Sequence, residues 1–183
     1  MARLPYLSRE DLPEEHRDIL ARNINLHRIL AHSPGGARAF SVLGGYIRHK
    51  SPLNPRLREL AILQVGWLAR APYEWSHHIK IGHDFGVTDA DIENLIADTA
   101  GHPTGLDAAT KCVLRAAREM VAGPGASEAT VTELKTHLDN AALTDLVITI
   151  AFYCGVVRVL DTLKIDVEDD YMPYLRQFPL PAP

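Results

Sequence analysis

The fold is decided by residues 54–87, which read NPRLRELAILQVGWLARAPYEWSHHIKIGHDFGV. Asn54 followed by Pro55 is a good helix start, because asparagine caps free N–H groups and proline suits the first helical position. The helix from Pro55 to about Ala69 is apolar nearly all round, which is typical of a buried helix. This stretch therefore places a buried helix at the centre of the domain.

Helices are expected on both sides of this one. Pro72 begins the next helix, and Gly86 is a suitable left-handed residue to end it. The other expected helices run from Pro13 to about Arg22, from after Pro34-Gly35 to about His49, Thr88 to about Ala97, Asp107 to Ala122, Ser127 to about Leu138, and Asp145 to Leu163 with Thr144 as its cap. Alternating, strand-like patterns are nearly absent, so the sequence predicts an all-α bundle of about seven or eight helices.

Length and composition indicate one globular domain, residues 1–183, with arms at residues 1–24 and 166–183. Hydrophobic residues make up 46% of the chain, which is enough for a core, and charged residues make up 23%. The net charge of -4 argues against a nucleic-acid partner. No apolar run reaches the roughly 18 residues that a membrane span needs, and no signal core follows Met1. We therefore expect a cytoplasmic protein without a membrane partner.

The helix from Asp145 to Leu163 is also hydrophobic nearly all round. Such a helix is buried either at the centre of a domain or at a subunit interface. The second alternative predicts an obligate homo-oligomer.

Glu59 is the unusual residue of the central helix. It shares a face with Ile62, Leu63 and Gly66, three, four and seven residues onward. A carboxylate on an apolar face must be paired or have a raised pKa, and raised carboxylate pKa values suit a general acid or base. The alternative is that Glu59 simply faces solvent near the helix start or pairs with a neighbouring arginine.

The following helix carries a second acidic and basic group. Glu74 and His78 are four residues apart and can meet on one face, with His77 on the flank and Tyr73 four residues before His77. A carboxylate beside an imidazole fixes the tautomer and raises the basicity of the ring, which suits proton transfer. The alternative is an exposed Glu–His pair that contributes only a few tenths of a kcal/mol.

A metal site is not expected. Glu74 and His77 have the Glu-x-x-His spacing of di-iron helical bundles, but those sites need a second such motif, and none follows. No glycine-rich phosphate loop marks a nucleotide cofactor. Cys112 and Cys154 stand alone in apolar surroundings, which is typical of buried thiols. No cofactor is therefore predicted.

The motif from Arg58 to Leu63, followed by Tyr73-Glu74-Trp75 and His78, resembles the core of the carboxymuconolactone decarboxylase/AhpD-like superfamily. The resemblance covers about residues 25–168 and implies an AhpD-like helical fold. Members of this superfamily commonly form dimers, trimers or hexamers, so a homo-oligomer is implied as well.

In the AhpD-like branch, the glutamate is followed by Cys-x-x-Cys-x-x-x-His, and the two cysteines reduce peroxides. Ala71 and Glu74 stand at those two cysteine positions here, and His78 stands at the histidine. Reduction of a peroxide through a disulfide needs a thiolate, so the resemblance favours the cofactor-free decarboxylases instead.

The resemblance implies a lyase that uses acid/base chemistry on a small carboxylated or lactone substrate. The expected catalytic residues are Glu59, Tyr73, Glu74 and His78, with His78 protonating the carbon that loses carbon dioxide. The expected substrate-binding residues are His77, Trp75, Tyr153 and Arg158. Two alternatives stay open: a helical binding protein without activity, and a relic of an alkylhydroperoxidase.

Overall fold

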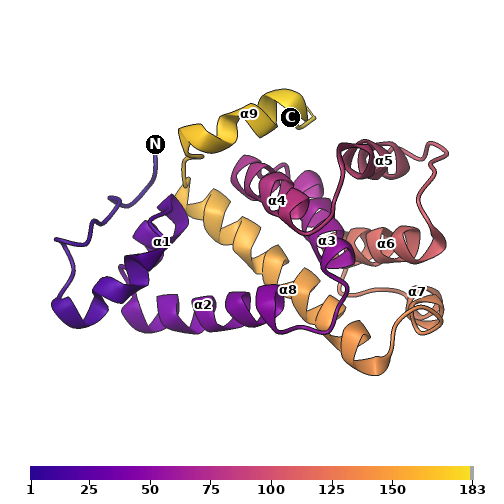
Figure 1. Ribbon diagram of the computed structural model, residues 1–183, viewed down its shortest axis with the longest axis horizontal. Coiled ribbons are helices and arrows are strands. Elements are labelled where there is room, and N and C mark those ends of the chain that lie inside the picture. The colour runs from indigo at the N-terminus through magenta and orange to yellow at the C-terminus, as the bar shows by residue number, and fades with distance from the viewer. Residues whose placement is uncertain (182–183) are drawn as a thin grey trace.

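The computed structural model describes residues 1–181, which are all-helical and contain no strand (Figure 1). Its elements are η1 (Glu14–Ala21), α1 (Asn25–Leu30), α2 (Pro34–His49), α3 (Pro55–Leu68), α4 (Pro72–Asp84), α5 (Asp89–Thr99), α6 (Ala108–Ala122), α7 (Glu128–Leu134), α8 (Asn140–Leu163), η2 (Asp169–Tyr171) and α9 (Met172–Gln177), where η marks a 3-10 helix. The fold class is as predicted. The short helices α1 and α9 have no counterpart in the sequence-based expectation.

Helix α3 lies at the centre, as its composition predicts. Every residue from 58 to 66 is buried, and α3 packs against α4, α6 and α8. Ile62 and Val65 belong to the larger core cluster shared with α6 and α8, whereas Leu60 and Leu63 pack into the cluster with α4 and α5. Because α3 contributes to both clusters, it connects them. Burying one such side chain stabilises the fold by about 1.5–3 kcal/mol.

Helix α8 is central but not buried all round. Val147, Ile148 and Ala151 are exposed on one side of it. By length and composition alone α8 could cross a membrane, with a mean hydropathy of 1.8 and 44% of that window buried. The expectation that no segment is long and apolar enough is therefore corrected. Packing against α3 and α6 gives α8 the position of a core helix.

The helix ends follow local chemistry. The Asn54 side chain accepts a hydrogen bond from the Leu57 N–H, and Thr88 with Asp91 forms a capping box at the start of α5. Gly86 has a φ of +90° and follows the end of α4, as expected.

Two predicted boundaries are wrong. Helix α8 begins at Asn140, because Asp139 is its cap and accepts a hydrogen bond from the Ala142 N–H at 2.8 Å. The Thr144 hydroxyl instead donates to the Asn140 carbonyl one turn back, a bond that threonine makes inside helices. Helix α7 ends at Leu134 rather than near Leu138.

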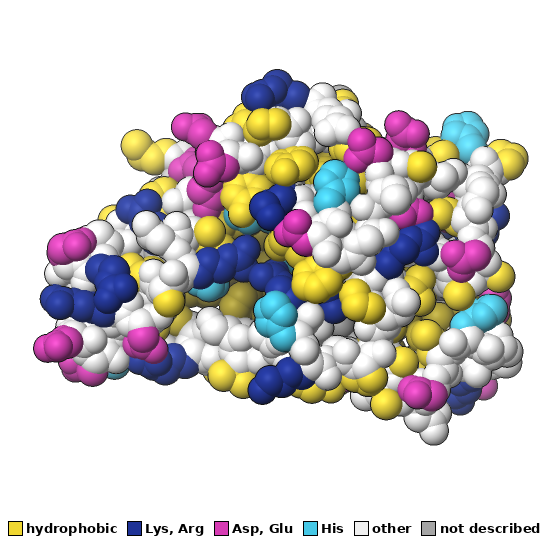
Figure 2. Space-filling model, viewed as in Figure 1, with side chains coloured by type: hydrophobic (Ala, Val, Ile, Leu, Met, Phe, Trp, Pro, Cys, Tyr) yellow, Lys and Arg dark blue, Asp and Glu magenta, His cyan; other side chains and the backbone are white. Residues whose placement is uncertain are grey.

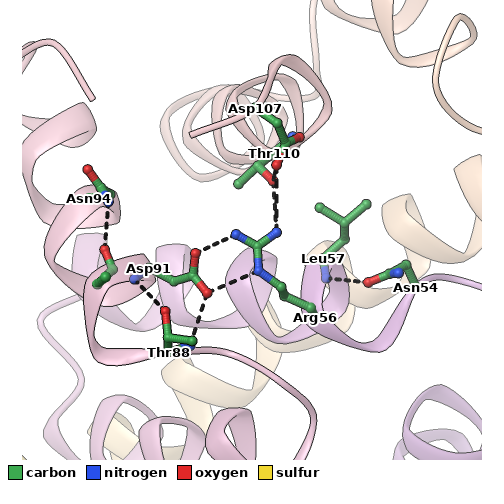
Figure 3. A network of polar contacts seen from close by, with 9 residues as sticks. Asn54, Arg56, Leu57, Thr88, Asp91, Asn94, Asp107 and Thr110 are labelled. Carbon is green, nitrogen blue, oxygen red and sulfur yellow. Dashed lines mark hydrogen bonds and ion pairs between the residues drawn. The ribbon is translucent and has the colours of Figure 1, made fainter. Parts of the chain in front are cut away.

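Arg56 connects the starts of three helices (Figure 3). Its Nε donates to Asp91 Oδ2 at 3.0 Å on α5, and its Nη1 donates to Thr110 Oγ1 at 3.2 Å on α6. Asp91 Oδ2 also accepts the Thr88 N–H of the capping box. The network fixes α5 and α6 to the beginning of α3, the helix that carries Glu59.

The chain ends lie on the same side of the molecule (Figure 1). The Tyr6 hydroxyl donates to Asp166 Oδ2 at 3.0 Å, and the Trp75 Nε1–H donates to the Phe178 carbonyl at 2.8 Å. Phe178 is buried against α4, so the segment after residue 166 packs on its own chain. The last two residues of the proposed C-terminal arm, 182 and 183, lie outside the described part.

Gly66 sits where the backbone of α3 comes close to that of α4. A Cβ at this position would lie 3.3 Å from the Trp75 backbone nitrogen and 3.6 Å from Glu74 Cγ. We expect Gly66→Ala to lower the free energy of unfolding by about 1–3 kcal/mol, because the backbone of α4 must shift.

Urea unfolding measures this cost, and Gly155→Ala is the matched control. Gly155 is also helical, but no atom lies within 4 Å of an added Cβ, so alanine there should be neutral or stabilising. Equal stabilities of the two variants would contradict the close approach.

Candidate active site

Three expected residues form one line across the interface of α3 and α4. The His78 Nδ1–H donates to Glu59 Oε2 at 2.7 Å, and His78 Nε2 lies 2.9 Å from Glu74 Oε1. The first contact is a hydrogen bond, whereas the second is an ion pair that leaves Glu74 Oε1 without an aligned hydrogen bond. All three side chains are at least 95% buried. The imidazole is therefore held between two carboxylates out of water.

Arg58 completes the line on the other side of Glu59. Its Nε donates to Glu59 Oε1 at 2.9 Å, and its guanidinium lies over the Phe85 ring at 4.5 Å. Arg58 is only 2% exposed. The alternative of a solvent-facing Glu59 is therefore wrong, although its pairing with a neighbouring arginine is found. Four buried groups alternate in sign: Arg58, Glu59, His78 and Glu74.

These contacts set the protonation states of His78 and Glu59. Burial lowers the pKa of His78, but the charges of Glu74 and Glu59 and their contacts outweigh it and raise this pKa to about 9. Burial raises the pKa of Glu59, but His78 and Arg58 outweigh it and hold this pKa below its usual range. At neutral pH, His78 is a cation and Glu59 an anion, so His78 is equipped to donate a proton.

His77 has a different carboxylate partner. Its Nε2–H donates to Glu168 Oε2 at 2.7 Å. The ring lies between two aromatic rings, Tyr73 at 4.1 Å and Tyr171 at 3.5 Å, both nearly parallel to it. Burial lowers the pKa of His77 despite the opposing effect of Glu168. At neutral pH, His77 is therefore neutral while its neighbour His78 is charged.

The Tyr73 hydroxyl does not form the hydrogen bond to His78 that a proton relay to this ring requires. Its hydroxyl donates to Glu168 Oε1 at 3.1 Å and accepts the Leu26 N–H at 3.2 Å. Burial, followed by the charge of Glu168, raises the pKa of Tyr73. Tyr73 thus remains protonated and belongs with His77 and Glu168.

A cavity of about 170 Å³ opens beside these groups. Tyr73, Glu74, His77 and His78 from α4 form one wall. The rest is mostly apolar or basic and comes from the segment before α1 and from α1, α2, α4 and α8: Arg22, Ile24, Leu26, His27, Phe40, Ser41, Gly44, Gly45, Arg48, His49, Ile81, Phe152, Tyr153 and Val156. Figure 2 shows a hollow in this face, near α2 and α8, with basic and histidine side chains gathered around it. The volume suits a molecule smaller than a typical drug.

Tyr153 lies in this cavity, as expected, with its ring edge-on to His78 at 5.0 Å. Burial, followed by the charges of Glu74 and Glu59, raises the pKa of the Tyr153 hydroxyl, and Arg48 opposes this. The hydroxyl is therefore protonated and can serve as a hydrogen-bond donor.

Two residues expected to bind substrate lie elsewhere. The Trp75 side chain is wholly buried on the side of α4 that packs against α9. Arg158 lies on another side of α8, where it donates to the Cys154 carbonyl and lines a separate cavity with Asp161. Neither residue lines the cavity beside His78.

The structure adds two residues that sequence reasoning missed as site residues. Arg48 lines the cavity from α2, whereas Arg158 does not. Glu168 reaches His77 from 91 positions along the chain. The basic cluster Arg48-His49-Lys50 at the end of a helix could have indicated Arg48 as a site residue. Glu168 stands among other acidic residues, and nothing in the sequence singles it out.

Neither cysteine lies in the cavity. Cys112 is buried in the core and Cys154 is partly buried on α8, and both are free thiols. Burial raises the pKa of both thiols, which makes them poor nucleophiles. Among residues 1–181, no group of three or more His, Cys, Asp and Glu side chains has the arrangement of a metal site.

Residues 34–119 match the family model of the carboxymuconolactone decarboxylase family. No curated protein matches the chain. The chain resembles solved structures of two uncharacterized peroxidase-related proteins. That from Ralstonia eutropha JMP134 has a TM-score of 0.80 and 20% identity, with 95% of each chain covered. That from Silicibacter sp. TM1040 has a TM-score of 0.77 and 19% identity, with 93% of each chain covered.

A third similar structure is the debrominase Bmp8, a cysteine-to-alanine variant in complex with 2,3,4-tribromopyrrole. Its TM-score is 0.74 at 18% identity, over 93% of this chain and 94% of that one. At such identities, these likenesses concern the fold. The match over residues 34–119 contains Glu59, Glu74 and His78, and the helical fold is similar to that of the AhpD-like structure, so the chain resembles the carboxymuconolactone decarboxylase/AhpD-like superfamily in both respects.

Proposed function

We propose that the protein is a cofactor-free lyase that removes carbon dioxide from a small carboxylated or lactone substrate by proton transfer. One observation carries this proposal: a cationic imidazole, His78, lies between the buried carboxylates Glu59 and Glu74 in the wall of a small cavity. A decarboxylation leaves electrons on carbon, and a positioned acid that protonates this carbon lowers the barrier.

The two nitrogens of His78 have different parts in this proposal. Nδ1 donates an aligned hydrogen bond to Glu59, whose charge Arg58 stabilises, so this side orients the ring. Nε2 has only the unaligned contact with Glu74. The Nε2 proton is therefore the one transferred to the substrate carbon, and Glu74 stabilises the cation until transfer.

Arg48 supplies the group that holds a substrate carboxylate. It lines the same cavity as His78, and the Tyr153 hydroxyl in that cavity is protonated and able to donate. A guanidinium and a hydroxyl are suitable donors to one carboxylate. The cavity also has apolar walls, including Phe40 and Phe152, which suit a ring or a short hydrocarbon part of the substrate.

The proposal is tested with a panel of small lactone acids and keto acids in D2O. The lyase should release carbon dioxide and leave at least one deuterium on the carbon that carried the lost carboxylate, which mass spectrometry of the product detects. Binding of these acids without carbon dioxide release would contradict the lyase and favour the binding-protein alternative.

Arg48→Gln should raise the KM for the substrate about 10–100-fold with a smaller change in kcat, because it removes a charged donor that holds ground state and transition state alike. Steady-state kinetics of the purified variant measure this split. Arg158→Gln is the matched control, because it also removes an arginine but one in a separate cavity. An unchanged KM in Arg48→Gln would contradict the assignment.

We also propose that the protein acts in the cytoplasm as a homo-oligomer. Exposed apolar residues on two helices, Val42 and Leu43 on α2 and Val147 and Ile148 on α8, support an association through α2 or α8. Multi-angle light scattering measures the assembly, and a monomer at micromolar concentration would contradict it.

A further inference from the structure

Glu168 joins three parts of the chain and binds two residues of the cavity wall, Tyr73 and His77. Its Oε1 accepts the Asn25 N–H at 2.6 Å and the Tyr73 hydroxyl at 3.1 Å, and its Oε2 accepts the His77 Nε2–H at 2.7 Å. Burial raises the pKa of Glu168, but the bonds from His77 and Asn25 outweigh it and lower this pKa to about 2. Glu168 is thus an anion at all ordinary pH values and can only accept hydrogen bonds.

This pairing determines the tautomer of His77. Because the carboxylate accepts from Nε2, a neutral ring carries its hydrogen there, and the lone pair remains on Nδ1. Tyr73 and Tyr171 cover the two faces of the ring, so only its edge is free to react. His77 lines the cavity that His78 lines. A neutral imidazole oriented by a carboxylate is the arrangement of a general base.

The charged and titratable groups around His77 come from several elements. Glu168 precedes η2, Tyr171 lies within it, and Tyr73, Glu74 and His78 share α4 with His77. Arg22, His27, Arg48 and His49 complete the cavity from the segments before and within α1 and α2. His78 is therefore a buried cation beside a neutral ring. When the surroundings of two neighbouring titratable groups push their pKa values apart, the protonated group can act as the acid and the unprotonated one as the base.

We propose that His77, positioned by Glu168, is a general base that takes a proton from a carbon next to a carbonyl group of the bound substrate. The cavity would then hold a base and an acid, and the protein would exchange such protons and interconvert keto and enol forms. This inference rests on the site of the proposed lyase but not on the loss of carbon dioxide.

The step balances without an outside reagent. His77 Nδ1 takes the proton, the electrons of the C–H bond form a carbon–carbon double bond, and the carbonyl electrons move to oxygen. The His78 Nε2 proton neutralises this oxygen and gives the enol. His77 becomes a cation paired with Glu168, and His78 becomes neutral. The reverse steps restore both rings and return a proton to carbon.

Levulinate and its enol lactone, α-angelica lactone, are suitable probes, since both are small and both have acidic C–H bonds beside a carbonyl. Proton NMR in D2O follows the loss of these C–H signals. The wild-type protein should exchange them faster than buffer does. His77→Gln should slow the catalysed exchange about 100-fold or more, the usual contribution of a general base.

Glu168→Gln tests the positioning role. It preserves an oxygen for the Asn25 and Tyr73 donors but removes the charge, and it should slow exchange about 10–100-fold. Because Glu168 raises the pKa of His77, its removal should also move the acidic limb of the pH–rate profile to lower pH. A merely structural bond would not move this limb. His83→Gln is the matched control, because His83 pairs with Asp89 through Nε2 at 2.9 Å outside the cavity.

The results distinguish this inference from the proposed lyase. Release of carbon dioxide without catalysed exchange of either probe overturns the inference and leaves the lyase intact. Exchange without release of carbon dioxide from any acid supports the inference and overturns the lyase. Wild-type exchange rates in both folded variants, His77→Gln and Glu168→Gln, overturn the assignment of the base.

Discussion

His78→Gln should lower turnover of the lyase by about 10²–10⁴-fold, the usual contribution of a positioned general acid. Glutamine can donate a hydrogen bond to Glu59 or Glu74, but it has no proton to give to carbon. The change also leaves two buried carboxylates without the cation between them. Breaking a buried ion pair in this way costs about 3–5 kcal/mol, so one carboxylate should take up a proton.

A low turnover could come either from the loss of the acid or from unfolding of the variant, so folding and turnover are both measured. Circular dichroism and urea unfolding first establish that His78→Gln is folded. The turnover of Glu74→Gln then provides a second test, because this variant keeps the imidazole and removes only one of its partners. Retention of full turnover in both folded variants would exclude His78 as the acid.

Stability should fall by about 3 kcal/mol between pH 6.5 and pH 9 because of His78. Its pKa is about 9 in the folded protein, against 6.5 for the ordinary residue. A folded-state pKa above the unfolded one stabilises fully below pH 6.5, and this contribution is lost as the pH rises through 9.

The other shifted groups of the site act outside this window. Burial lowers the pKa values of His27 and His77, so these rings affect stability only below about pH 6.5. Glu59 and Glu168 have lowered pKa values and stabilise above the usual pKa of glutamate, and they lose this contribution as the pH falls further. Urea unfolding at intervals from pH 6 to pH 9.5 measures the slope, which should disappear in His78→Gln below about pH 8. At higher pH, Cys112 and Cys154 have raised pKa values and add a slope in both proteins. An equal slope in that variant would assign it to other groups.

The sequence could predict Glu59, Glu74 and His78 because their positions depend on local rules. Glu74 and His78 are four apart on one helix, and Glu59 stands out as a charge on an apolar face. Their meeting across α3 and α4 then followed from the family motif. The central position of α3 was predictable in the same way, from its apolar composition.

Contacts between distant segments could not be predicted by these rules. Glu168 meets His77 only because the chain after α8 packs back over α4, and no periodicity encodes that return. Arg158 and Tyr153 both lie on α8, but five residues of helix turn Arg158 to another side. Trp75 follows Glu74 directly, and adjacent helical residues point in different directions.

The resemblance to the AhpD-like branch sets Glu74 at the position of the second redox cysteine, and this has a consequence for how the two branches could interconvert. Glu74 is one of the two carboxylates that keep His78 protonated. A cysteine in its place would bring a thiol and also remove part of the electrostatic support of the imidazolium. The same substitution would thus lower the pKa of His78. The histidine would change from a charged proton donor toward a neutral proton acceptor. Acid chemistry and thiol chemistry in this fold would then differ at two positions, Ala71 and Glu74, and the second of these also controls the proton of His78.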